Sequence, residues 1–286
     1  FFGVYVSTDR IQHAFWEQSD HPWLDGERAS WRFAHAIRRS YQQLDSALGR
    51  LIEACDEEPT VLVVSDHGFG DLEGDLYLNT LLEEMGLLVV RSGAVGDSFG
   101  DIDWSRTRAY ARGLFGNIWL NLRGREPLGQ VEPGPEADAL LYEITDRLRG
   151  LRAPGGGAPI VQAVFRGDEL YATAGERKPT SAEGGAPDLV VVPRDYRWMT
   201  RSGRELDAAR RLTSAPAIRH SGNHRMNGVI VGGGPGLEVG AVPGLQHLID
   251  LTPTALALLG IEVPRSLDGR PMTELLACDV AWTDDI

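Results

Sequence analysis

Aspartate and histidine occur together at two places in the chain, with spacings that suit metal binding. Asp9 and His13 are four residues apart, so a helical turn at this point would put a carboxylate and an imidazole on one face. Asp66 and His67 are adjacent and follow an apolar run at residues 61–64. Carboxylate and imidazole groups without cysteine favour zinc, manganese or iron over a structural cysteine site. These pairs are therefore candidate ligands of a divalent ion.

His224 is a fifth candidate, in the segment 221–228 (SGNHRMNG) that precedes another apolar run. Each position also has an ordinary structural interpretation: Asp9 as a helix cap with His13 on the surface, Asp66 as the cap of a turn, and His224 as a loop histidine. All three sites lie at or near predicted strands, and open α/β sheets place their sites at the carboxyl edge of the strands. The three sites together favour metal binding, whereas no single one decides it.

The elements expected around these residues form an α/β unit. Residues 1–6 and 60–64 are short, continuous apolar runs, typical of buried strands in a parallel sheet. Between them, residues 27–54 have apolar side chains every three or four positions, which predicts a long helix with Cys55 in the core. Strand, helix and strand in this order predict a parallel pair joined by a right-handed crossover.

The amino-acid composition changes after about residue 98, where Gly, Arg, Asp and Pro become frequent. We therefore expect a first core part at 1–98, an insertion or cap at 99–215, and a second core part at 216–286. Further predicted elements are helices at 79–85, 135–151 and from 252 to 259, and strands at 160–165, 188–192 and 228–231.

The composition excludes several classes of protein. A net charge of −13 over 286 residues argues against a protein that coats nucleic acid, whose surface would be basic. A small anionic substrate remains compatible with it, because a metal ion can dominate the local field. The two cysteines form no CxxC pair, no apolar run approaches the ~18–20 residues that span a bilayer, and no signal segment opens the chain. We expect a cytoplasmic protein without a membrane or a nucleic-acid polymer as partner.

Several segments in order resemble the type I phosphodiesterase/nucleotide pyrophosphatase family of the alkaline-phosphatase superfamily. They are residues 7–16 (STDRIQHAFW), 65–70 (SDHGFG), 115–122 (FGNIWLNL), 124–127 (GREP), 221–225 (SGNHR), 250–254 (DLTPT) and 267–270 (LDGR). The resemblance implies a mostly parallel α/β sheet flanked by helices, truncated at its N-terminus and interrupted by the insertion. It also implies hydrolysis of phosphodiester or nucleotide pyrophosphate bonds in a small phosphorylated substrate.

By this resemblance, Asp9, His13 and His224 would hold one metal ion, and Asp66 and His67 would belong to a second. Zinc is the expected metal, with manganese or iron as alternatives. Two ions about 3.5–4 Å apart would assist an in-line phosphoryl transfer to a Thr or Ser nucleophile. No residue of this chain matches that nucleophile, and the resemblance places it upstream of Phe1, so this chain alone is expected to be inactive.

Two other functions remain open at this point. One is another hydrolase or mutase of the same superfamily, acting on phosphomonoesters, phosphonates or sulfates. The other is an inactive metal-binding or ligand-binding fragment, because the nucleophile is not matched. Among further polar residues, we expect Asn79 to cap a helix. Three arginines could meet a substrate anion or be ordinary surface residues: Arg108, Arg112 and Arg125.

Overall fold

The computed structural model describes residues 1–19, 32–91, 99–113, 115–171, 185–202, 211–216 and 220–284. The chain divides into two compact units. The terminal unit consists of Phe1–Tyr5, Arg38–Phe69 and Arg225–Ile286, and the central unit consists of Val6–Ile37 and Gly70–His224.

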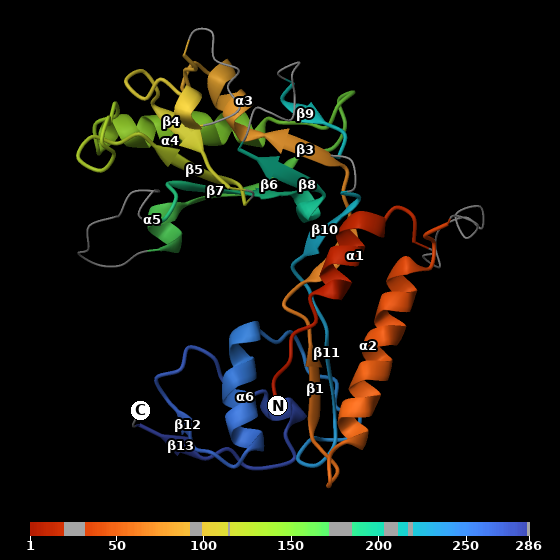
Figure 1. Ribbon diagram of the computed structural model, residues 1–286. Helices are drawn as coiled ribbons and strands as arrows, with labels where there is room; N and C mark the ends of the chain where they lie inside the picture. Colours follow the sequence, from red (N-terminus) through yellow and green to blue (C-terminus); the bar gives the residue numbers. More distant parts are fainter. Residues whose placement is uncertain are drawn as a thin grey trace. The chain divides into compact units, whose positions relative to one another are not determined.

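The largest sheet belongs to the central unit and has the strand order β4-β5-β7-β6 (Figure 1). Its strands are β4 (Ala109–Ala111), β5 (Asn117–Leu120), β6 (Val161–Arg166) and β7 (Leu189–Pro193). Each neighbouring pair is antiparallel. Buried and half-buried residues alternate along β7, because successive side chains of a strand point to opposite faces of the sheet.

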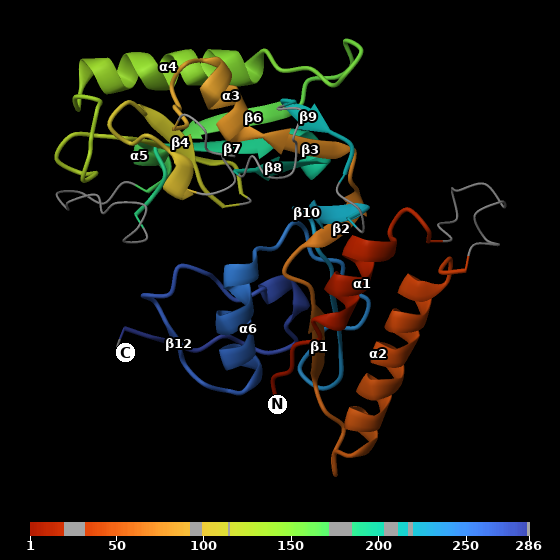
Figure 2. The ribbon, with the colours of Figure 1, turned by 45° about the horizontal axis from the view of Figure 1, so that its top comes forward.

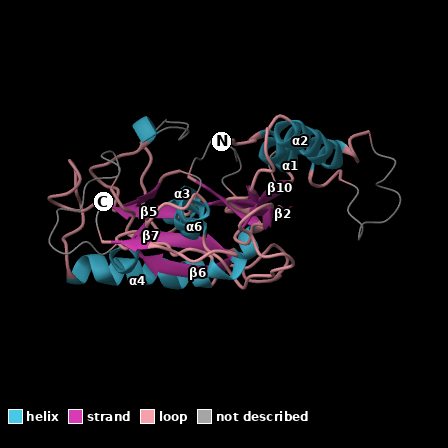
Figure 3. Ribbon diagram, turned by 90° about the horizontal axis from the view of Figure 1, so that it is seen from below, coloured by secondary structure: helices cyan, strands magenta, loops and turns pink. Residues whose placement is uncertain are grey.

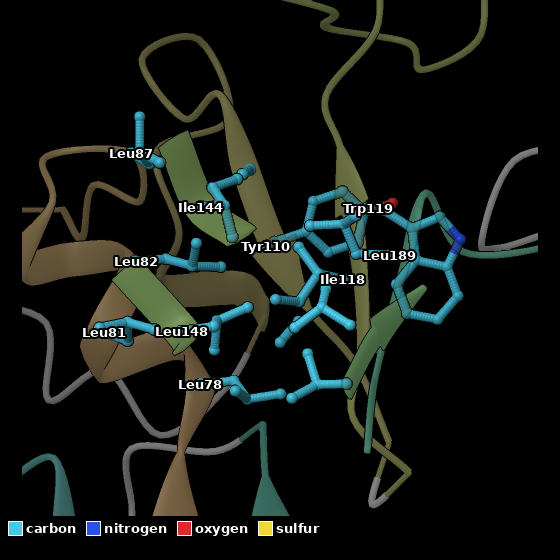
Figure 4. Packing of buried hydrophobic residues seen from close by; sticks show 14 of the residues in the cluster. Leu78, Leu81, Leu82, Leu87, Tyr110, Ile118, Trp119, Ile144, Leu148 and Leu189 are labelled. Atoms are coloured by element: carbon cyan, nitrogen blue, oxygen red, sulfur yellow. The ribbon is translucent and has the colours of Figure 1, made fainter. Parts of the chain in front are cut away.

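Helices α3 (Leu78–Glu84) and α4 (Pro135–Arg149) pack on this sheet, α4 against β6 and α3 against β4. Figures 2 and 3 show α4 running along β6. Its proline lies in the first turn, and acidic residues at its start and arginines at its end complement the helix dipole. Its buried residues recur at the spacing of one helical face: Ala137, Leu140, Leu141, Ile144 and Leu148. Figure 4 shows Ile144 and Leu148 beside the leucines of α3 in the core.

A second sheet of the central unit has the order β8-β3-β9. Strand β3 (Gly74–Tyr77) is parallel to β8 (Trp198–Arg201) and antiparallel to β9 (Thr213–Ser214). Every residue of β3 and β8 is buried, including the charged Asp75 and Arg201. The central unit also contains α1 (Ser7–Phe15) and α5 (Gly167–Leu170). Strand β2 (Gly68–Asp71) pairs with β10 (Gly222–Arg225), and the division between the units falls within both strands.

The terminal unit contains α2 (Ala36–Glu53), β1 (Val61–Val64), β11 (Ile230–Gly233), α6 (Leu251–Leu258), β12 (Val263–Pro264) and β13 (Trp282–Thr283). Strands β1 and β11 form an antiparallel pair, with α2 on one side and α6 on the other in Figures 1 and 2. A small core cluster beside α6 is formed by Ala257, Val263 and Leu276.

Asp250, just before α6, connects the start of this helix to a later loop. Its carboxylate accepts hydrogen bonds from the backbone N–H groups of His247, at 3.0 Å, and Arg270, at 2.9 Å. Its carbonyl accepts the hydroxyl of Thr254 at 2.6 Å. Burial raises the pKa of Asp250, but the two N–H donors outweigh it, so the pKa lies below its ordinary value.

The fold class is mixed α/β, as the sequence predicts, but the predicted strand at residues 1–6 is wrong. These residues form no strand, all are exposed, and α1 begins at Ser7. The predicted parallel pair with 60–64 is therefore also wrong, because β1 pairs with β11 in the antiparallel sense. An apolar run indicates a strand, but its direction depends on which partner supplies the hydrogen bonds.

The described strands also do not form the mostly parallel sheet that was expected. The pairs β3–β8 and β12–β13 are parallel, whereas the largest sheet is antiparallel throughout. Residues 27–31 of the predicted long helix lie outside the described residues, and the helix observed is Ala36–Glu53. Cys55 is exposed rather than in the core. The boundaries 1–98, 99–215 and 216–286 stay a prediction.

None of the helices in the described ranges combines the length and the apolar composition that crossing a membrane would require.

Candidate metal centre

Helix α1 places Asp9 and His13 one turn apart on the same face. The His13 Nε2 and Asp9 Oδ1 atoms are 3.5 Å apart, and both side chains are partly buried. The N-cap position is held by Val6, and Asp9 lies within the first turn. Asp9 is therefore not the cap of this helix, and its carboxylate lies beside His13.

His224, on β10, meets both residues of α1. Its Nε2 is 3.0 Å from His13 Nε2 and 3.1 Å from Asp9 Oδ1. Within the described part of the chain, these three residues are the one group of three or more His, Cys, Asp or Glu side chains close enough to hold a single metal ion.

The spacing of the three donor atoms fits one divalent ion. Donors bonded to a tetrahedral zinc at about 2.0–2.1 Å lie about 3.3–3.4 Å from one another. The three observed separations of 3.0, 3.1 and 3.5 Å are within a few tenths of an ångström of that value. Two imidazoles and one carboxylate are also a donor set that zinc, manganese and iron accept.

A hydrogen bond fixes which nitrogen of His13 faces the cluster. His13 Nδ1 donates to the carbonyl of Gly222 at 2.9 Å, and a carbonyl can only accept, so the ring proton is on Nδ1. Neutral His13 therefore presents a lone pair on Nε2. A histidine that binds metal through one nitrogen commonly donates from the other in this way.

Two further hydrogen bonds hold α1 against the chain before β10. The backbone N–H of Ser221 donates to the carbonyl of His13 at 2.9 Å, and the N–H of Glu17 donates to the Ser221 hydroxyl at 3.2 Å. Within β10, the Asn223 side chain donates to the carbonyl of Tyr196 at 2.8 Å. Hydrogen bonds thus hold in place the backbone segments that carry the three candidate ligands.

His220 lies beside the cluster, and its position was not singled out from the sequence. Its ring stacks on His13, with centroids 5.4 Å apart and an interplanar angle of 18°. Burial lowers the pKa of His220, the nearby Arg201 and His13 lower it further, and Asp75 opposes them.

A profile of type I phosphodiesterases and nucleotide pyrophosphatases matches residues 1–227. The chain belongs to the type I phosphodiesterase/nucleotide pyrophosphatase family. The resemblance stated from the sequence is thereby confirmed, and the matched residues include all five candidate ligands. A crystal structure of a mutant of alkaline phosphatase PafA is similar at a TM-score of 0.43 and 15% identity, over 95% of this chain and 46% of that chain. This chain thus spans less than half the length of that one. A search among curated proteins found no match.

The other two candidate ligands of this family member, Asp66 and His67, belong to the terminal unit. His67 Nε2 is 3.6 Å from Asp66 Oδ1, and its Nδ1 lies 3.0 Å from the carbonyl of Gly68. Asp66 is exposed, and His67 is partly buried. Ser65 is bonded to Val229 through both its backbone N–H and its hydroxyl. The role of Asp66 and His67 as metal ligands stays a prediction.

Other polar residues considered from the sequence have structural partners. Arg125 donates to both carboxylate oxygens of Asp188, at 2.8 and 2.7 Å, and Arg108 pairs with Glu136 at 2.6 Å. Asn79 is not a helix cap: it lies inside α3 and exchanges two hydrogen bonds with the backbone of Ala111. Among the described residues, ion pairs therefore account for Arg125 and Arg108, and hydrogen bonds to the backbone of Ala111 account for Asn79.

Proposed function

We propose that this chain supplies the metal centre of a hydrolase that acts on phosphodiester or nucleotide pyrophosphate bonds. The observation that supports this most is the convergence of the donor atoms of Asp9, His13 and His224. Membership of the type I phosphodiesterase family gives the class of bond, and the family comprises hydrolases.

In this proposal, Asp9, His13 and His224 hold one divalent ion, most simply zinc, and Asp66 and His67 contribute to a second. A bound divalent ion polarises a phosphoryl oxygen and balances the negative charge of the substrate. The residues of this chain orient that centre: Gly222 fixes the proton of His13 on Nδ1, and the hydrogen bonds of Ser221 keep α1 next to β10.

The nucleophile is a separate part of the proposal. The family resemblance implies a Thr or Ser that attacks phosphorus, and no residue of the chain matches it. Ser65 is a poor substitute, because its hydroxyl accepts the N–H of Val229 at 2.8 Å. We therefore assign the nucleophile to a segment outside residues 1–286 and expect this chain alone to bind metal without turnover.

Metal binding is tested with the chain of residues 1–286. It is first stripped of metal with a chelator and then titrated with zinc in competition with a chromophoric chelator. We expect at least one zinc ion per chain and a large loss of affinity in His224→Ala. His35→Ala is the matched control, because it removes an exposed histidine of the same unit. If the wild type binds zinc no more tightly than His224→Ala, the proposed centre is wrong.

The class of substrate is tested with the longest natural chain that contains these residues. We expect bis(p-nitrophenyl) phosphate to be hydrolysed faster than p-nitrophenyl phosphate or p-nitrophenyl sulfate. A preference for the monoester or the sulfate would instead identify another hydrolase of the superfamily. No hydrolysis at all by a zinc-loaded protein would identify a binding protein.

A further inference from the structure

His220 contacts the candidate centre through its ring, and the charges of a buried ion pair act on it. The ring lies nearly parallel to that of His13, whereas His13 and His224 are tilted by 41°. The Nδ1 atom of His220 is buried and has no hydrogen-bond partner among the described residues. His220 is thus neither an exposed loop residue nor a member of the group of three donors.

The ion pair near His220 joins two strands of the β8-β3-β9 sheet. Asp75, on β3, is fully buried, and Arg201 ends the neighbouring strand β8. Arg201 Nε donates to Asp75 Oδ1 at 3.1 Å, and Asp75 Oδ2 has no partner among the described residues. A buried ion pair recovers its desolvation cost only with excellent geometry and further hydrogen bonds. Stability alone is therefore a weak explanation for these two charges.

The charges of Arg201 and Asp75 both act on His220. An imidazole can serve both environments, because the face of its ring stacks on another ring while its nitrogens stay polar. Asp75 and Arg201 thus influence His220 through their charges, and His220 contacts the ring of His13. Only the last of these four residues offers a donor atom to the centre.

We propose that His220 is a positioning residue for the metal centre, and that its ring, stacked on His13, keeps His13 in the orientation that directs Nε2 toward Asp9 and His224. This rests on the proposed function, because it presumes that His13 binds metal. The Nδ1 bond to Gly222 fixes one edge of the His13 ring. The stack on His220 restrains rotation of the ring plane, which that single bond leaves free.

The test separates the ring of His220 from its nitrogens. His220→Ala removes both, and His220→Phe keeps an aromatic ring for stacking. We expect His220→Ala to weaken zinc affinity about 10-fold, as for other residues that orient a metal ligand. We expect His220→Phe to stay close to the wild type. In the cobalt-substituted protein, the visible absorption bands should change in His220→Ala and be retained in His220→Phe. Thermal unfolding of each variant without metal shows whether it folds.

The outcomes distinguish this inference from the proposed function. If His224→Ala loses zinc while His220→Ala keeps wild-type affinity and cobalt bands, the centre stands and the positioning role is wrong. If His220→Phe is as damaging as His220→Ala, stacking is not the mechanism and the inference also fails. If the wild type itself binds no zinc, the proposed function fails and the inference with it. His35→Ala remains the control for loss of an unrelated histidine.

Discussion

His13 and His224 face each other through their Nε2 atoms at 3.0 Å, although they are 211 residues apart in the sequence. Two imidazole nitrogens at this distance either share a proton or face a common cation. The proton of His13 is on Nδ1, where Gly222 accepts it, so His13 Nε2 is an acceptor. With the Asp9 carboxylate 3.1 Å from His224 Nε2, the pair favours a shared cation.

Zinc should stabilise the folded chain, because the folded state brings the three donors together and the unfolded state does not. At a free zinc concentration 100-fold above its Kd, the gain is about 2.7 kcal/mol. Thermal unfolding of the chelator-treated protein, with and without zinc, measures it. His35→Ala should show the same gain, and His224→Ala should lose most of it. An equal gain in His224→Ala would place the zinc elsewhere.

The sequence predicts the local half of this centre and not the long-range half. The four-residue spacing of Asp9 and His13 puts them on a shared face in any helix, so their proximity depends only on whether a helix forms there, as α1 does. His224 reaches them through tertiary folding, which spacing does not encode, and family resemblance was needed to group the three. Nothing in the sequence pattern indicates that His220 belongs to this site, because a stacking contact leaves no periodic pattern.

The strands are likewise only partly predictable from the sequence. Apolar runs predict the positions of β1, β6 and β7 within a few residues, because such runs are buried in almost any sheet. They do not predict direction, so β1 was assigned a parallel partner and has the antiparallel partner β11. Residues 1–6 have the same apolar character as β1, yet no strand forms there, because a strand also needs a partner for its backbone.

Arg125 should matter for stability and not for metal binding. It donates to both oxygens of Asp188 and to the carbonyl of Leu120, and its side chain is almost fully buried. Arg125→Ala leaves the Asp188 carboxylate without its partner, so we expect a loss of about 3–5 kcal/mol in urea unfolding with zinc affinity unchanged. Arg123→Ala is the control, since its pair with Glu132 is exposed, and should cost less than about 1 kcal/mol. Loss of zinc affinity in folded Arg125→Ala would contradict this assignment.

Asp250 should make the stability of the terminal unit depend on pH in the acid range. Its pKa is lowered in the folded state from an ordinary value of 3.8, so its contribution is complete above the unfolded pKa and is lost as pH falls through the folded pKa. Asp250→Asn should therefore be less stable than the wild type at pH 7, by about 1–2 kcal/mol. The difference should shrink below pH 3.8. Chemical unfolding at several pH values measures it, with the exposed Asp268→Asn as control. A difference that grows in acid would have the wrong sign.

The buried pair of Arg201 and Asp75 should affect stability and metal affinity in separable ways. Arg201→Met leaves the Asp75 charge buried without its partner and should cost about 3–5 kcal/mol. The double variant Asp75→Leu/Arg201→Met removes both charges and should recover much of that loss, because apolar residues of similar volume can replace a buried ion pair. Zinc affinity should not recover, since the double variant also removes the charges that act on His220. Urea unfolding and zinc competition on the single and double variants measure the two quantities. A double variant that regains both stability and zinc affinity would show that the pair serves the β3–β8 sheet alone.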